Sequence, residues 1–286
     1  MKLSMKKFLL LIIIIISSSV TVIAQRHEFG LSLGRANIIG DIGKTNYIEI
    51  FPMDLHRVPI SVGLLYRLNL NNRQSLRFNL IYNKVYFDDY KASEDYRYDR
   101  DIKDDNKIIE GSALFEYYFF DINDIKRLGG SPYIFGGIAA YGYNDRKYTI
   151  THDLYKNPDG SLKYPSSPKD FDTKSSYSES NKVDFSIPFG VGFKLKFNYN
   201  WLLSFEVGAR YTFQDNLDYS AIKTDKFTIN TSSYLLDALY TDEINKRNAE
   251  IIGKHQTGNT YKSNDWYLIW GLNLTYTFGR PPCYCY

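Results

Sequence analysis

The clearest pattern along the chain is an alternation of apolar and polar residues over 183–198. Every odd position from Val183 to Phe197 is apolar, and the even positions carry small, polar or charged side chains. Successive side chains of a β-strand point to opposite faces, so a period of two predicts a strand with one apolar and one polar face. Its 16 residues are long for a strand of a soluble protein, where about 5–6 is usual.

Seven further segments show the same alternation and complete a set of eight expected strands. They cover residues 27–35, 58–70, 75–87, 108–120, 132–144, 201–213 and 265–278. Because bacterial outer-membrane barrels have an even number of antiparallel strands, the sequence predicts an all-β fold, an eight-stranded antiparallel up-and-down transmembrane β-barrel. The 26 tyrosines and 18 phenylalanines agree with this fold, since aromatic residues favour strands and form girdles at the edges of membrane barrels.

Short and long connections alternate between these segments. Residues 71–74 and 199–200 are short links, 121–131 is intermediate, and the long ones are 36–57, 88–107, 145–182 and 214–264. Outer-membrane barrels likewise have short periplasmic turns and long extracellular loops. A soluble lipocalin-like barrel is the alternative, but its outer face would be polar, and here the bulkier and more regular face is apolar. In the last loop, apolar residues over 232–254, with two serines that can cap and Gly253 near the end, predict a helical insertion.

The first 24 residues have the layout of a cleavable export signal. Three lysines precede a nine-residue apolar run over 8–16, and Ala24 ends the segment. A membrane-spanning helix would need about 20 residues. We therefore expect a signal peptide at 1–24, a barrel at 25–278 and a periplasmic tail at 279–286, in the outer membrane after Sec-type export. Losing the three lysines takes the formal charge from +3 to 0, which indicates no nucleic-acid partner.

Charged residues recur on the polar faces of the expected strands. An eight-stranded barrel has an interior that side chains just fill, and an unpaired buried charge is costly. Since both signs occur in similar numbers, we expect these groups to pair and plug the lumen. A conducting pore is the alternative, and the small diameter argues against it. The expected interior charges are Glu28, Arg67, Arg77, Glu110, Glu116, Asp184, Lys194, Lys196, Glu206 and Arg210.

Residue types used in catalysis occur without a recognised catalytic spacing. None of the four histidines lies in a Gly-x-Ser-x-Gly or His-x-x-x-His setting. A loop-based hydrolase using Asp88, Asp89 and His152 to activate water is an alternative, but basic residues in the same loop indicate an ordinary solvated loop. We therefore predict a protein that is not an enzyme and uses no cofactor, metal or small-molecule substrate.

The only two cysteines of the mature chain follow the last expected strand. Two prolines before them cannot continue a β-ladder, so the tail should leave the barrel on the periplasmic side. A bridge between Cys283 and Cys285 would be strained at this spacing, and the compartment is oxidising. A disulfide to a partner and two free thiols both remain open, and a zinc site would need about two more ligands.

Several segments, in order along nearly the whole mature chain, resemble one protein family. The most specific stretch runs from Asp265-Trp266-Tyr267 to the terminal Cys283-Tyr284-Cys285. The other segments are 27–30 (HEFG), 37–43 (NIIGDIG), 206–213 (EVGARYTF) and 274–279 (LTYTFG). On these residues the chain resembles the PorG group, outer-membrane barrels of the type IX secretion and gliding machinery. The long loops 145–182 and 214–264 match no segment of that group.

The resemblance implies a function that alternation alone does not. PorG-like barrels tether a periplasmic ring, built from a lipoprotein and its soluble partner, to the outer membrane. The chain would then be a structural anchor that contacts lipid and this ring, and not the pore through which cargo passes. Cys283 and Cys285 are the expected partner contacts. A freestanding barrel, an OmpX-like adhesin or structural protein acting through its outer loops, is the alternative.

Overall fold

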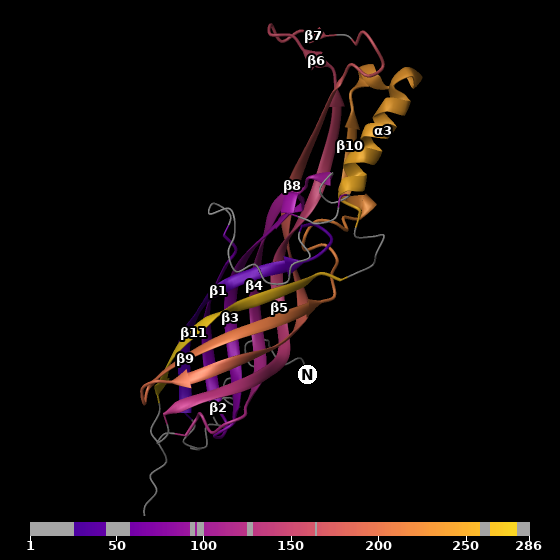
Figure 1. The fold of residues 1–286 in the computed structure, drawn as a ribbon. Helices are drawn as coiled ribbons and strands as arrows, with labels where there is room; N and C mark the ends of the chain where they lie inside the picture. The colour runs from indigo at the N-terminus through magenta and orange to yellow at the C-terminus, as the bar shows by residue number, and fades with distance from the viewer. Residues whose placement is uncertain are drawn as a thin grey trace, which may run out of the picture.

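The computed structural model describes residues 26–43, 58–91, 95, 100–124, 128–163, 165–257 and 264–278. The expected signal segment and the tail that contains Cys283 and Cys285 lie outside the described residues. A ring of strands forms the body of the molecule, and a long outgrowth bearing a helix rises from one end of it (Figure 1). None of the helices described is long and apolar enough to span a membrane.

The ring consists of eight antiparallel strands. Their order is β5-β4-β3-β2-β1-β11-β9-β8, and β5 pairs with β8 to close it. The predicted eight-stranded up-and-down barrel is therefore confirmed. The strands are β1 (Arg26–Ile39), β2 (Ile60–Asn69), β3 (Gln74–Asp88), β4 (Lys103–Tyr118), β5 (Gly129–Asp153), β8 (Asp172–Lys196), β9 (Trp201–Thr212) and β11 (Trp266–Phe278).

The two faces of the barrel wall differ as the alternation predicts. Along β8 and one residue beyond its end, the odd residues from Val183 to Phe197 point outward and are 42–75% exposed. The even residues Ser186, Lys194 and Lys196 are buried. Soluble monomers rarely expose apolar patches larger than a few hundred Å², whereas a lipid-facing apolar band about 25 Å tall is the rule in membrane barrels. The belt therefore fits a transmembrane barrel of the outer-membrane type.

Inward-facing glycines make room for aromatic rings that cross the lumen. A Cβ at Gly190 or at Gly208 would lie within 2.6 Å of the Phe135 ring, and one at Gly192 would collide with the Tyr133 ring. Both aromatic side chains come from β5 and are buried. The glycines of β8 and β9 thus leave room for rings from β5 to fill a narrow interior.

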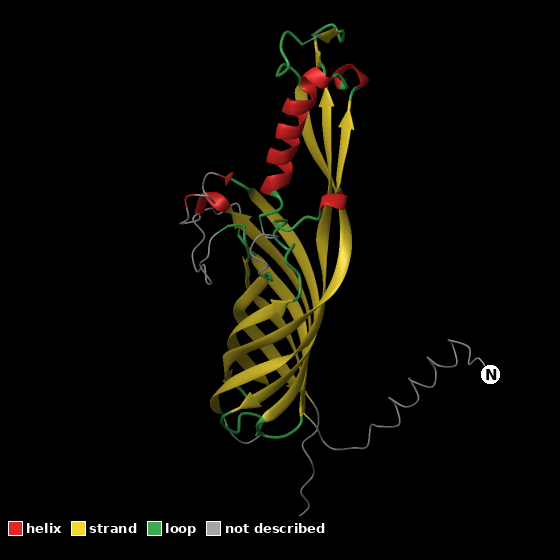
Figure 2. Ribbon diagram, turned by 90° about the vertical axis from the view of Figure 1, so that its right-hand side faces the viewer, coloured by secondary structure: helices red, strands yellow, loops and turns green. Residues whose placement is uncertain are grey.

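β5 and β8 continue together beyond the ring, and here the prediction of a loop over 145–182 is wrong. Their pairing runs without interruption from Tyr141↔Asp184 to Asp153↔Asp172. β10 (Phe227–Thr231) joins β5 in parallel, and a small hairpin of β6 (Tyr155–Lys156) and β7 (Leu162–Lys163) lies near the tip (Figure 2). Residues 174–182 are exposed throughout. With water on both faces of this part of β8 no alternation is required there, which is why the sequence pattern missed the β8 extension.

The helical insertion is present as α3 (Ala238–Lys254), which packs against the outgrowth (Figure 2). Asp237 caps it by accepting a hydrogen bond from the Leu239 amide, so the expectation that the earlier serines cap this helix is wrong. Ile244 belongs to a buried cluster with Leu154, Phe171 and Leu235. Three short 3-10 turns complete the described helices: η1 (Asp89–Lys91), η2 (Thr224–Lys226) and η3 (Ser233–Leu235).

Candidate functional site

A chain of six alternating charges fills the lower lumen. It starts at Lys194, whose Nζ lies 2.8 Å from Glu28 Oε1, and Glu28 Oε2 lies 2.6 Å from Arg67 Nη1. Arg67 Nε lies 2.6 Å from Glu116 Oε2, and the other oxygen of Glu116 lies 3.1 Å from Arg77 Nε. The chain ends where Arg77 Nη1 meets Glu206 Oε2 at 2.5 Å. These six side chains come from β1, β2, β3, β4, β8 and β9, so the network ties together six strands of the ring.

A second group lies higher in the lumen. Arg210 Nε is 3.2 Å from Glu110 Oε2, and the Tyr267 hydroxyl donates to the same oxygen at 2.6 Å. The interior thus holds four cations, Arg67, Arg77, Lys194 and Arg210, and four carboxylates, those of Glu28, Glu110, Glu116 and Glu206. All eight are at most 5% exposed. The charges balance and the groups pair, so they can remain buried together. Their side chains occupy the space that an aqueous channel would need.

Two of the ten expected interior charges lie apart from these groups. Lys196 is buried near the short-turn end and donates to the backbone carbonyl oxygen of Asp124 at 2.5 Å. Asp184 lies at the outer end, where Gln214 donates to its carboxylate. Strand alternation gives the inward side correctly for Asp184, but its height places it above the paired charges. The expectation that it joins the network is therefore wrong.

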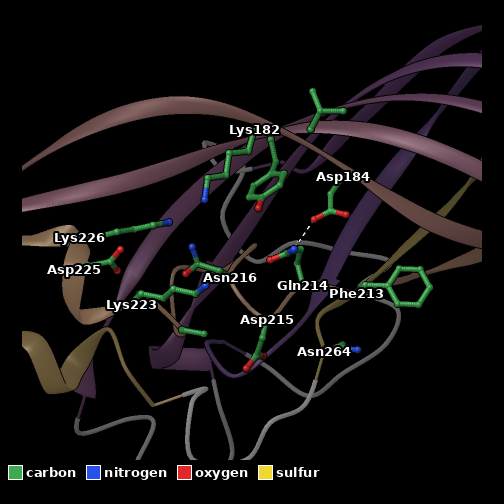
Figure 3. A pocket seen from close by; sticks show the side chains of 13 residues that line it. Lys182, Asp184, Phe213, Gln214, Asp215, Asn216, Lys223, Asp225, Lys226 and Asn264 are labelled. Carbon is green, nitrogen blue, oxygen red and sulfur yellow. Dashed lines mark hydrogen bonds between the residues drawn. The ribbon is translucent and has the colours of Figure 1, made fainter.

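A polar pocket of about 470 Å³ opens beside Asp184, between β8 and the loop that follows β9. Figure 3 shows Gln214 pointing toward Asp184, and Lys182 from β8 and Lys226 from η2 also line the pocket. Both lysines contact Asp145 Oδ2, at 2.7 Å and 2.5 Å respectively. Burial alone would raise the pKa of Asp145, but hydrogen bonds from the two lysines lower it. The lysines are therefore already engaged by a carboxylate.

Four aspartates gather at the outer mouth of the barrel, next to this pocket. Asp218 Oδ2 accepts from the Ile42 amide at 2.8 Å, and Asp265 Oδ2 accepts from the Leu217 amide at 2.7 Å. A Cβ at Gly40 would collide with the carboxylates of both aspartates. Segments 37–43 and 265–267, which are far apart in the sequence, therefore meet here. The four are Asp41, Asp215, Asp218 and Asp265.

The proximity of these carboxylates changes their acidity. Burial, with the nearby carboxylates of Asp41 and Asp218, raises the pKa of Asp215 to about 7. Burial also raises the pKa of Asp218 and of Asp265, and neighbouring carboxylates add to the effect. All lie outside the membrane-spanning strands. Asp215 and Asp218 could not be recognised from the sequence, because the loop after β9 shows no periodicity and only the fold brings it to segments 37–43 and 265–267.

The residues considered for a hydrolase are not brought together. Both ring nitrogens of His152 are engaged, Nδ1 with Thr173 Oγ1 at 3.0 Å and Nε2 with Asn248 Oδ1 at 2.9 Å. Asp89 instead accepts from Arg100 Nε at 2.7 Å. Within the described ranges, no group of three or more Asp, Glu, His or Cys side chains has an arrangement that could hold a metal ion.

Comparison with known proteins places the chain in a family. The family model described as domain of unknown function, DUF6089, matches residues 6–167, 161–235 and 235–286. The chain belongs to the DUF6089 family. No curated protein matches it. The family description assigns no activity to this DUF6089 protein.

Solved structures similar to the DUF6089 chain include three small bacterial surface proteins. Ail, the attachment invasion locus protein of Yersinia pestis, is 10% identical, with coverage of 90% of this chain and 100% of that one and a TM-score of 0.40. The outer membrane protein OprG from Pseudomonas aeruginosa is 10% identical, with coverage of 90% and 97% and a TM-score of 0.40. Neisserial surface protein A is 11% identical, with coverage of 89% and 97% and a TM-score of 0.37.

Proposed function

We propose that the protein is a structural anchor of the type IX secretion apparatus, which tethers a periplasmic ring lipoprotein and its soluble partner to the outer membrane. The observation that carries the anchor role is the filled lumen. Eight paired charges and the rings of Tyr133 and Phe135 occupy an interior that is narrow in any eight-stranded barrel. Such an interior suits an anchor and does not suit a conduit for protein cargo. The resemblance to the PorG group supplies the identity of the apparatus.

The ends of the barrel strands support a periplasmic position for the tail. β1 and β11 pair from His27↔Phe278 onward, so the last residue of β11 lies at the end of the barrel opposite the outgrowth (Figure 1). The short links between β2 and β3 and between β8 and β9 are at this same end. Short turns face the periplasm in outer-membrane barrels. The position of Phe278 at this end therefore supports the proposal of a periplasmic tail that carries Cys283 and Cys285.

The test is co-purification of the ring from detergent-solubilised membranes with a tagged barrel. We expect wild type to retain the ring lipoprotein and to give a reducible band of higher mass on non-reducing gels. Cys283→Ser with Cys285→Ser should weaken retention while the barrel stays folded. If the band is absent and the double variant secretes normally, the covalent contact is wrong, and the turn at 121–131 becomes the expected docking site. If no ring component co-purifies at all, the anchor proposal fails.

A second candidate function is favoured by the outgrowth. The β5–β8 extension with α3 projects away from the membrane-spanning ring (Figure 2), as a freestanding adhesin or structural barrel acting through its outer loops would require. Replacing residues 146–179 by a short turn separates the two functions. An anchor should keep its ring and its secretion, whereas a freestanding barrel should lose its surface interaction and show no secretion phenotype.

A further inference from the structure

Three basic side chains lie in one row of paired outward positions that runs across neighbouring strands. Arg35 on β1, Lys84 on β3 and Lys107 on β4 all occupy outward positions of their strands' alternation. Lys84 and Lys107 are direct partners across β3 and β4, and Ile60 on β2 pairs with Lys84. Since Gly34 pairs with Ser61, Arg35 lies beside Ile60. We call Arg35, Lys84 and Lys107 the rim cations.

The rim cations lie at the outer edge of the apolar belt. On β3 the outward residues below Lys84 are Leu76, Phe78, Leu80 and Tyr82. From Leu76 to Lys84 the strand advances about 26 Å at about 3.3 Å per residue. A strand tilt of about 40° turns this into about 20 Å along the membrane normal, close to the lipid-facing band of about 25 Å. Lys84 therefore lies at the outer membrane surface, on the side of the outgrowth.

The contacts around the rim cations leave excess positive charge. Lys84 Nζ lies 3.5 Å from Asp105 Oδ2 and 4.9 Å from the centre of the Tyr86 ring. Arg35 lies over the Trp270 ring at 5.8 Å. The directly opposed pair Lys84 and Lys107 thus has one carboxylate beside it, which leaves a formal charge of +1 on that pair. Like charges directly opposite each other across two strands destabilise a sheet, so an anion shared by Lys84 and Lys107 would relieve an unfavourable pair.

A shallow apolar groove of about 450 Å³ lies immediately below the rim cations. It crosses β1 to β4, and outward side chains form its walls. Gly111 lies on β4 at one side of the groove. A Cβ added there would have no heavy atom within 4 Å, so the surface stays open at that side. Hydrocarbon chains lying against this face of the barrel would meet the groove directly beneath the cations. Its wall residues include Leu33, Val62, Leu64, Leu80, Tyr82 and Ile109.

We propose that the rim cations and this groove bind a phosphorylated glycolipid of the outer leaflet. A phosphate would accept charge-assisted hydrogen bonds from Lys84 and Lys107, and Arg35 would contribute at the β1 side. The acyl chains would lie along the groove below. A glycolipid with several chains fits better than a two-chain phospholipid, because the groove spans four strands and the site faces the outside. The outward orientation follows from the short turns at the opposite end.

The test measures lipid retention by the purified full-length barrel with native mass spectrometry. The probes are diphosphoryl lipid A, its dephosphorylated form and phosphatidylglycerol. We expect wild type to retain diphosphoryl lipid A at least about tenfold better than either other lipid, because charge-assisted hydrogen bonds to phosphate are strong. The triple variant Arg35→Gln, Lys84→Gln, Lys107→Gln should lose this preference, and added salt should weaken binding to wild type.

Lys147→Gln is the matched control, because Lys147 is an exposed cation on β5 in the outgrowth. This variant should bind like wild type. Should the triple variant fail to fold, Lys107→Gln alone, in a barrel shown to be folded by heat-modifiable mobility, should still lower retention severalfold. Equal retention by wild type and the folded variants overturns the proposal. Equal binding of phosphatidylglycerol or of dephosphorylated lipid A overturns the assignment to a phosphorylated glycolipid.

Discussion

Replacing Glu116 by Gln tests whether the interior network holds the barrel together. The Glu116 carboxylate is fully buried and lies 2.6 Å from Arg67 Nε and 3.1 Å from Arg77 Nε. With charge centres about 4 Å apart and an effective dielectric constant of about 20, each pair contributes about 4 kcal/mol. Burying the charged carboxylate costs several kcal/mol of desolvation free energy, which Gln avoids, and this cost offsets part of the attraction to the two arginines. We therefore expect Glu116→Gln to lower the free energy of unfolding by about 3 kcal/mol, near the lower end for removing one partner of a buried pair.

A loss of this size is measurable by urea titration of the barrel in lipid vesicles, followed by tryptophan fluorescence and by heat-modifiable mobility. With a denaturant slope of about 1–3 kcal/mol per M, the midpoint should fall by about 1–3 M. Asp121→Asn is the matched control. Asp121 forms an ion pair with Arg73, and the two side chains are 29% and 49% exposed, respectively. An exposed ion pair contributes about 1 kcal/mol or less. Equal midpoints for Glu116→Gln and Asp121→Asn would refute the reasoning.

Three other outcomes are expected. Val191→Lys places a cation in the lipid-facing belt and should reduce the folded, membrane-assembled fraction at a cost of about 2–4 kcal/mol, whereas Val191→Leu should assemble normally. The pKa of Asp215 is raised in the folded state to about 7 from an ordinary 3.8. The protonated carboxyl therefore stabilises the fold at pH 4, and this contribution to stability is lost as the pH rises through 7. Protease resistance of the outer mouth should fall over that range, and Asp215→Asn should remove the dependence. In planar bilayers the wild-type barrel should show no steady conductance, and a stable open channel would contradict the plugged interior.

The ring of the barrel could be predicted from the sequence because lipid outside and a crowded lumen inside impose a strict alternation. Val183 to Phe197 satisfy it at every odd position, and the same rule assigned Arg67 and Glu206 to the interior. Which charges pair could not be predicted, since that depends on the relative heights of strands far apart in sequence. Asp184 shows this limit, because its inward orientation was predicted correctly and its position along the barrel was not.

The outer part of the molecule escaped prediction for a different reason. Residues 145–153 and 172–182 form regular strands, but water reaches the β8 part of this pairing and leaves no periodic signal. The helix was predictable because it covers a buried cluster through Ile244. The gathering of Asp41, Asp215, Asp218 and Asp265 depends on loops meeting above the lumen, and the pattern within any one segment contains no information about that meeting.

The interior network also has a consequence for how the chain reaches its final state. Lys194 and Glu28 are 166 residues apart, and Arg77 and Glu206 are 129 residues apart. Contacts of such high sequence separation form late, because the entropy of closing long loops opposes them. Until β8 and β9 arrive, Glu28 and Arg77 lack these partners, and burial without a partner is costly. A half-formed barrel therefore lacks part of its interior pairing, which favours cooperative joining of β8 and β9 to the strands formed earlier.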